Sequence, residues 1–245
     1  MSKKVKYALF FLALAAFVAF SVLMEVAGLG PSRVKVEIKQ SSGYGFVDAE
    51  ALKKYVLEKV DGLSGDSLSK RIFSQEKKIS QNPYIEKVVV YAQPSGDIRV
   101  ELWEEIPVFR LVTDTGNYYV SRRDKMMPVK AGTGVDVPVV SGQADKKSFP
   151  DIRGLISALK EDKFFSSQTV GIEVSRRKKK DGNVYDYAVY TRSPGFKVVL
   201  GTTEDLDVKL DNFRVIYSYL YDQNRTGDYK VVNLEFVNYL ICQKK

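Results

Sequence analysis

Apolar and polar residues alternate with a period of two in several short stretches of the first half of the chain. Residues 34–40 alternate valine and isoleucine with lysine and glutamate, and residues 85–93 and 98–103 are rich in β-branched and aromatic side chains. This spacing and composition predict half-buried strands. Residues 94–97 read Pro-Ser-Gly-Asp, which is typical of a turn, so we expect the last two strands to form a hairpin.

Two helical patterns lie between the first strand and this hairpin. The first begins after Asp48, a favourable N-cap residue, and ends at Gly62. Its apolar side chains recur at helical spacing at Leu52, Val56 and Val60. The second covers residues 67–81 and stops before Pro83, because the residue that precedes a proline avoids the helical region. The order strand, helix, helix, strand, strand predicts a three-stranded sheet with both helices on one face.

After Pro107 the pattern changes to many short β-forming stretches. Candidate strands are residues 108–112, 118–121, 137–140, 170–175, 186–191 and 197–200. Residues 152–159 have the spacing of an amphipathic helix. A longer helix, which Thr202 could cap, is marked by Leu206, Leu210, Phe213, Tyr217 and Leu220. Residues 229–242 close the chain as one long strand. We therefore expect an α+β protein whose second domain is β-rich and contains two helices.

The N-terminus carries a long apolar stretch. Residues 8–24 contain no charge, and extending the stretch to residues 7–29 adds only Glu25. As a helix these 23 residues would be about 34 Å long, enough to cross a hydrocarbon core of about 30 Å. Lysines precede the stretch, and positive flanks stay in the cytoplasm. We expect a cytoplasmic tail of residues 1–6 and a retained transmembrane helix; a cleaved secretory signal is the alternative.

Composition excludes much of enzyme chemistry. The chain has no histidine and one cysteine, Cys242, so it can hold neither a Ser-His-Asp triad nor an intrachain disulfide. Glu104 and Glu105 are adjacent on a predicted strand and would point to opposite faces. Without Lys3, Lys4, Lys6 and Glu25 the chain has 35 basic and 29 acidic residues, a modest excess of +6, and its aromatic residues do not alternate with basic ones as in a nucleic-acid platform. We expect no catalytic, cofactor-binding or metal-binding residues, no nucleic acid and no small-molecule substrate.

The last predicted strand is the candidate binding element. Residues 233–241 are apolar and aromatic with few charges, and at a sheet edge they would offer unpaired N–H and C=O groups to a partner strand. On this hypothesis Phe236, Asn238, Tyr239 and Leu240 carry much of the contact. The alternative is an internal strand whose apolar side chains are plain core.

Residues 176–180 are five consecutive basic residues that precede an Asp-Gly-Asn turn. They could contact anionic lipid headgroups or a cell-wall polymer. The alternative is a solvated hairpin tip whose charges discourage edge pairing.

Several motifs in order along the chain are similar to one known family. The first unit, with Gln-Asn-Pro-Tyr-Ile at residues 81–85 and Gly-Asp-Ile-Arg-Val at residues 96–100, resembles a POTRA domain. In the second unit the matching segments are residues 118–120, 127–128, 137–142, 199–201, 209–210 and 232–236. With the N-terminal anchor, this order resembles the FtsQ/DivIB family of bacterial cell-division proteins over almost the whole chain.

The resemblance implies a non-enzymatic scaffold of the divisome at the septum. It implies a POTRA domain at residues 31–106 and a β domain at residues 107–245, both outside the cytoplasmic membrane, with the N-terminus inside. The partners implied are the FtsB–FtsL coiled-coil pair and other divisome proteins, and the role is regulation of septal cell-wall synthesis. Two alternatives are a POTRA-bearing component of an envelope assembly or secretion system and an extracytoplasmic hydrolase.

Overall fold

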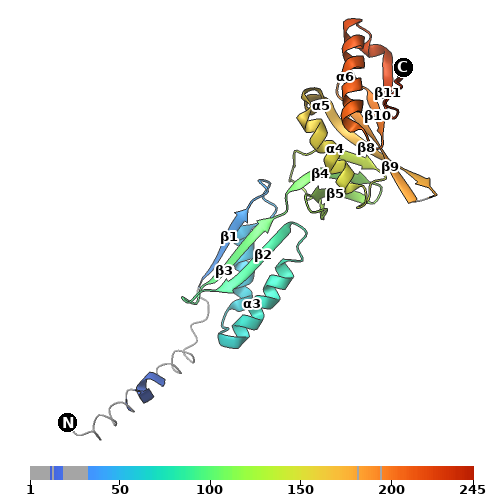
Figure 1. Cartoon of the computed structure of the whole chain (residues 1–245). Coiled ribbons are helices and arrows are strands. Elements are labelled where there is room, and N and C mark those ends of the chain that lie inside the picture. The colour runs from blue at the N-terminus through green and yellow to red at the C-terminus, as the bar shows by residue number, and fades with distance from the viewer. Residues whose placement is uncertain (1–11, 13, 19–32, 181, 194) are drawn as a thin grey trace. The chain divides into compact units, whose positions relative to one another are not determined.

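The computed structural model describes residues 12, 14–18, 33–180, 182–193 and 195–245 (Figure 1). The chain divides into two compact units after Glu105. The expected cytoplasmic tail lies outside the described residues, and so does the expected transmembrane helix of residues 7–29, apart from residues 12 and 14–18, which are helical. Within the described ranges, no helix has the length and hydrophobicity required to cross a membrane.

The first unit has the predicted order of elements. They are β1 (Val34–Gln40), α2 (Ala49–Val60), α3 (Gly65–Ile79), β2 (Ile85–Ala92) and β3 (Ile98–Glu104). Strand β3 lies in the middle, parallel to β1 and antiparallel to β2. The carboxylate of Asp48 caps α2 as expected, because it accepts the N–H groups of Glu50 and Ala51 at 3.0 Å. Side chains of both helices and of all three strands form one core.

Two carboxylates in this unit accept hydrogen bonds from backbone N–H groups of other segments. Glu104 is completely buried and accepts the N–H groups of Ser42 and Val47 at 2.7 and 2.9 Å. It therefore anchors the loop between β1 and α2. Glu76 of α3 accepts the N–H of Val90 at 2.8 Å. Since Val90 lies on β2, at the edge of the sheet, this carboxylate occupies a backbone donor that a foreign strand would need.

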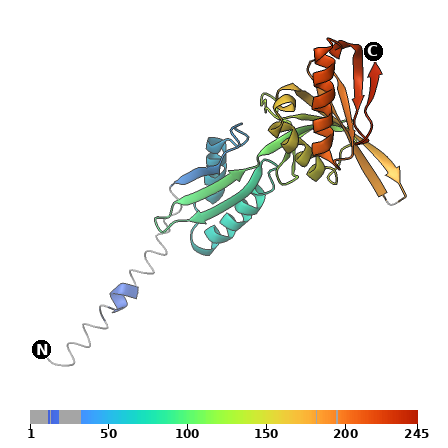
Figure 2. The same ribbon diagram turned by 45° about the horizontal axis from the view of Figure 1, so that its top comes forward.

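The second unit is a long mixed sheet with helices packed on one face (Figures 1 and 2). Its first four strands are β4 (Pro107–Thr113), β5 (Gly116–Ser121), β6 (Met126–Pro128) and β7 (Val139–Gly142). The crossover contains α4 (Phe149–Glu161) and α5 (Lys163–Gln168) and leads to β8 (Thr169–Lys179), which is parallel to β7. The remaining elements are β9 (Gly182–Thr191), β10 (Lys197–Gly201), α6 (Leu206–Asp222), the 3-10 turn η1 (Thr226–Asp228), β11 (Tyr229–Asn233) and β12 (Ile241–Lys244).

Three sequence predictions for this unit are wrong. Helix α5 adds to the two predicted helices; the carboxylate of Asp162 starts it by accepting the N–H groups of Phe164 and Phe165. Thr202 does not cap α6, which begins after Asp205, and the Thr202 hydroxyl contacts Glu204 instead. The third error, the single closing strand of residues 229–242, concerns the candidate site.

The end of the chain forms two antiparallel strands, β11 and β12, joined by a turn of residues 234–240. The side chain of Asn233 accepts the N–H of Glu235 at 2.8 Å. Such a local bond offers the backbone an alternative to a strand. Leu234 is 2% exposed and belongs to the core of the sheet's helical face. Together these two residues bend the chain where one long strand of residues 229–242 was predicted to continue.

Candidate partner-binding site

Strand β12 lies at one of the two edges of the sheet, whose order within the described residues is β12-β11-β10-β9-β8-β7-β4-β5-β6. The N–H of Lys245 donates to the carbonyl of Asp228 at 2.9 Å, toward β11. Because backbone groups in a strand point to alternate sides, the N–H and C=O groups of Cys242 and Lys244 face away from β11. The edge near the C-terminus marked in Figure 2 is therefore open to another strand.

The residues predicted to carry the contact lie in the turn beside this edge and not on a strand. Phe236 and Tyr239 are 54% and 72% exposed, and Leu240 is 38% exposed. Asn238 is also exposed. The structure thus places all four in one short segment, which continues directly into β12. The prediction that these four residues form an edge strand is wrong, because residues 234–240 form a turn.

A groove separates the turn from helix α6. It has a volume of about 370 Å³ and is lined by Asn212, Val215, Ile216, Tyr219, Val237, Asn238, Tyr239 and Leu240. Its walls are mostly apolar, and Val215 on the helix is exposed. Sequence reasoning assigned the apolar side chains of this helix to a single buried stripe and overlooked its outer side. Val208, Val215 and Tyr219 repeat at helical spacing outside that stripe, and this repeat is the signal that could have found the groove.

The turn is held in place from several sides. The side-chain amide of Asn212 donates to the carbonyl of Val237 at 2.9 Å, which ties the turn to α6. The N–H of Tyr239 donates to the carbonyl of Phe236 at 3.2 Å within the turn. Gly201 has a φ of +66°, and a Cβ there would lie 2.8 Å from Cγ of Glu235. Only glycine allows the end of β10 to approach the turn so closely.

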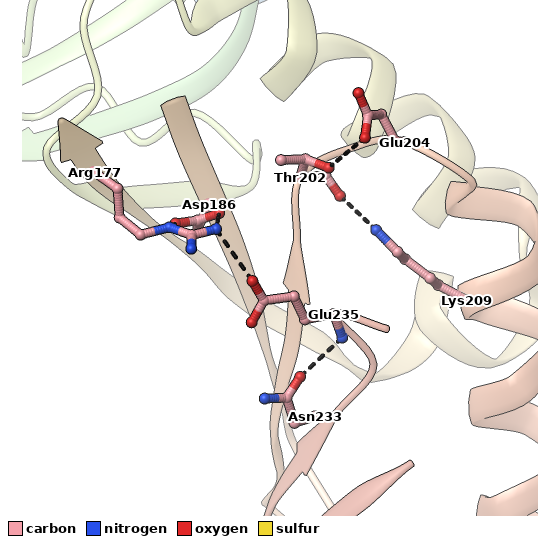
Figure 3. A network of polar contacts seen from close by, with 7 residues as sticks. All are labelled: Arg177, Asp186, Thr202, Glu204, Lys209, Asn233 and Glu235. Carbon is pink, nitrogen blue, oxygen red and sulfur yellow. Dashed lines mark hydrogen bonds and ion pairs between the residues drawn. The ribbon is translucent and has the colours of Figure 1, made fainter. Parts of the chain in front are cut away.

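Charged side chains hold the other side of the turn (Figure 3). Arg177 of β8 binds the carboxylate of Asp186 on β9 and also that of Glu235, at 3.1 Å. The hydrogen bond to Asp186 raises the pKa of Arg177. Lys209 of α6 is buried and donates to the carbonyl of Thr202 at 2.9 Å. Burial lowers the pKa of its amine, while nearby carboxylates, including those of Glu235 and Asp186, oppose this shift.

The groups that this site exposes are suited to binding another protein segment. The described residues hold no group of three or more histidine, cysteine, aspartate or glutamate side chains able to hold a metal ion. The Cys242 thiol lies on β12, and burial raises its pKa, which disfavours the reactive thiolate. What the site presents is an open strand edge, an apolar groove and a fixed turn with exposed aromatic side chains.

Comparisons with known proteins match both units. A family model described as "FtsQ/DivIB, C-terminal related" matches residues 106–243, and a model of a POTRA-like domain matches residues 31–103. No protein of curated function matches the chain. A solved structure, POTRA1-3 of the periplasmic domain of Omp85 from Anabaena, is similar at 17% sequence identity with a TM-score of 0.24. The match covers 67% of this chain and 66% of that chain, so this chain spans just under two thirds of its length.

The two family matches follow the division of the molecule. The POTRA-like match covers the unit with the strand, helix, helix, strand, strand order, and the other match begins at the first residue of the second unit. The second match alone includes more than half of the 245 residues and contains the open edge, the groove and the turn. The chain therefore belongs to the FtsQ/DivIB family and combines a POTRA-like domain with the family's C-terminal domain.

Proposed function

We propose that the chain is a non-enzymatic divisome scaffold that captures a partner by strand addition to β12. Membership of the FtsQ/DivIB family supports a scaffold role in cell division in general. The observation that carries the finer proposal is the unpaired edge of β12 beside an apolar groove. A partner segment on this edge would gain main-chain hydrogen bonds, and its side chains would enter the groove and supply specificity.

The partner that we propose is the FtsB–FtsL coiled-coil pair. The exposed side chains of Phe236, Tyr239 and Leu240 would supply apolar contact area, and Asn238 a polar contact. Aromatic anchors of this kind often dominate binding energy. In this proposal the apolar stretch of residues 7–29 anchors the protein in the cytoplasmic membrane at the division septum. The two described units lie outside the membrane and help to regulate septal cell-wall synthesis.

A pair of variants at Lys244 tests strand addition. Lys244→Pro removes both the charge and the outward N–H, whereas Lys244→Ala removes the charge alone. Proline is tolerated on edge strands whose N–H faces solvent, so both variants should fold. We expect Lys244→Pro to weaken capture of purified FtsB–FtsL by about fivefold to tenfold more than Lys244→Ala, the value of one hydrogen bond. Equal capture by the two variants would contradict strand addition.

The cellular role has a separate test. A fluorescent fusion that tolerates export should give a band at mid-cell, and depletion of the protein should give filaments that segregate DNA without dividing. A uniform signal around the cell would instead favour a component of an envelope assembly or secretion system.

A further inference from the structure

The basic residues at the end of β8 differ in what their side chains contact. Arg177 binds two carboxylates, whereas Arg176 has one ion-pair contact, with Asp145 at 3.7 Å. Lys178 and Lys179 contact no carboxylate among the described residues. In the sequence these residues form one basic run, but in the structure Arg177 alone among them contacts Glu235 of the turn.

The guanidinium of Arg177 joins three segments that are far apart in the sequence. Arg177 lies on β8, Asp186 lies diagonally across from it on β9, opposite Ser175, and Glu235 belongs to the turn that begins after β11 (Figure 3). The planar guanidinium has several donors in a fixed geometry, so one side chain can bind both carboxylates at once. A lysine at this position could offer only a single ammonium group.

Without Arg177 the two carboxylates would face each other. The side chain of Asp186 is only 13% exposed and that of Glu235 is 30% exposed, so solvent screens them incompletely. Lys209 is a buried cation that interacts electrostatically with both carboxylates, but its amine already donates to the carbonyl of Thr202. Repulsion would then move Glu235, and with it the start of the turn, away from β9.

We propose that Arg177 is a positioning residue for the binding turn: through Glu235 it fixes the conformation in which the turn presents Phe236 and Tyr239 to a partner. This inference rests on the proposed function for its consequence in binding, but the clamp itself is a property of the isolated chain. Lys179 lies two residues further on the same face of β8 and contacts no residue of the turn, so Lys179→Ala removes an equal charge without affecting the clamp.

Amide hydrogen exchange of the unbound chain tests the clamp directly. In Arg177→Ala the amides of Glu235 and Tyr239 should exchange about fivefold faster, the upper range for a partly exposed ion pair, while amides of the β10 core stay unchanged. Lys179→Ala should leave all of them unchanged. Equal exchange in wild type and Arg177→Ala, or equal acceleration in both variants, would overturn the proposal.

A second variant separates repulsion from general loss of structure. Arg177→Ala combined with Glu235→Gln removes the like-charge pair, so exchange of the Tyr239 amide should return toward the wild-type rate. Failure of this rescue would count against positioning through Glu235. Affinity for purified FtsB–FtsL should follow the exchange rates, weakening about fivefold in Arg177→Ala and recovering in the double variant. If exchange behaves as expected but affinity does not change, the clamp stands and the proposed binding surface is wrong.

Discussion

Replacing Tyr239 by alanine probes the proposed contact surface at its most exposed aromatic side chain. Tyr239 is 72% exposed and lines the groove beside α6. A tyrosine side chain buries about 150–250 Å² when fully covered, so a bound partner could cover roughly 100 Å² or more of what is now exposed. At about 25 cal/mol per Å² this is worth roughly 2.5 kcal/mol. We therefore expect the Kd to rise by about 50-fold to 100-fold.

The assay is isothermal titration of purified residues 33–245 with FtsB–FtsL. A matched control is Phe73→Ala, because Phe73 is an equally exposed aromatic residue, at 71%, on α3 of the other unit. Since both side chains are largely solvated in the free protein, neither substitution should change the free energy of unfolding by more than about 0.5 kcal/mol. A Tyr239 variant that binds as tightly as the Phe73 control would refute the assignment of this surface.

Two further predictions concern the scaffold itself. Asp162→Ala removes the cap of α5 and one carboxylate partner of Arg214, which is 52% exposed and keeps Asp211, so unfolding should cost about 1–2 kcal/mol less in a denaturant titration, mostly through the lost cap. Burial alone would raise the pKa of Asp162, but the N–H groups of Phe165 and Phe164 and the guanidinium of Arg214 outweigh it and hold the pKa below its usual value. The stabilisation is thus complete above the unfolded pKa of about 4 and is lost as the pH falls through the lower folded pKa, so wild type and variant should converge in stability in strong acid; a constant difference would contradict this. Glu76→Ala frees the N–H of Val90 on the β2 edge, and analytical ultracentrifugation should then detect concentration-dependent self-association that Glu76→Gln, which can still accept the bond, suppresses; an Ala variant that stays monomeric would show that Glu76 does not guard the edge.

The element order of the first unit was predicted correctly because helix caps and the alternation of apolar and polar residues depend only on residues close together in the sequence. The carboxylate of Asp48 caps α2 through N–H groups two and three residues further along the chain. In residues 34–40 the apolar side chains pack against the core, whereas Lys35 and Lys39 are exposed. Glu104 shows where such rules end. Its partners Ser42 and Val47 lie about 60 residues earlier in the chain, so only the tertiary fold shows that this carboxylate is buried and anchors a loop.

The assignment of residues 233–241 as the binding element stays a prediction, and the backbone conformation predicted for them, a continuous strand, is wrong. The four residues predicted to bind, Phe236, Asn238, Tyr239 and Leu240, are exposed, yet the strand ends at Asn233 because its side chain bonds the backbone of Glu235. The groove could not be predicted from this segment alone, because half of it comes from α6. The contact between Arg177 and Glu235 could not be predicted either, because nothing in the sequence distinguishes Arg177 from the other four residues of the basic run.

A partner strand paired with the open edge of β12 would protect the outward backbone amides of that strand, and amide hydrogen exchange with and without FtsB–FtsL measures this pairing directly. The N–H groups of Cys242 and Lys244 face away from β11, whereas that of Gln243 faces it, so Gln243 is an internal reference on the same strand. Strand addition predicts that the Cys242 and Lys244 amides become protected on binding by at least about tenfold, while Gln243, already bonded in the free protein, changes little. Partner binding that leaves the Cys242 and Lys244 amides as exchangeable as in the free chain would contradict the account.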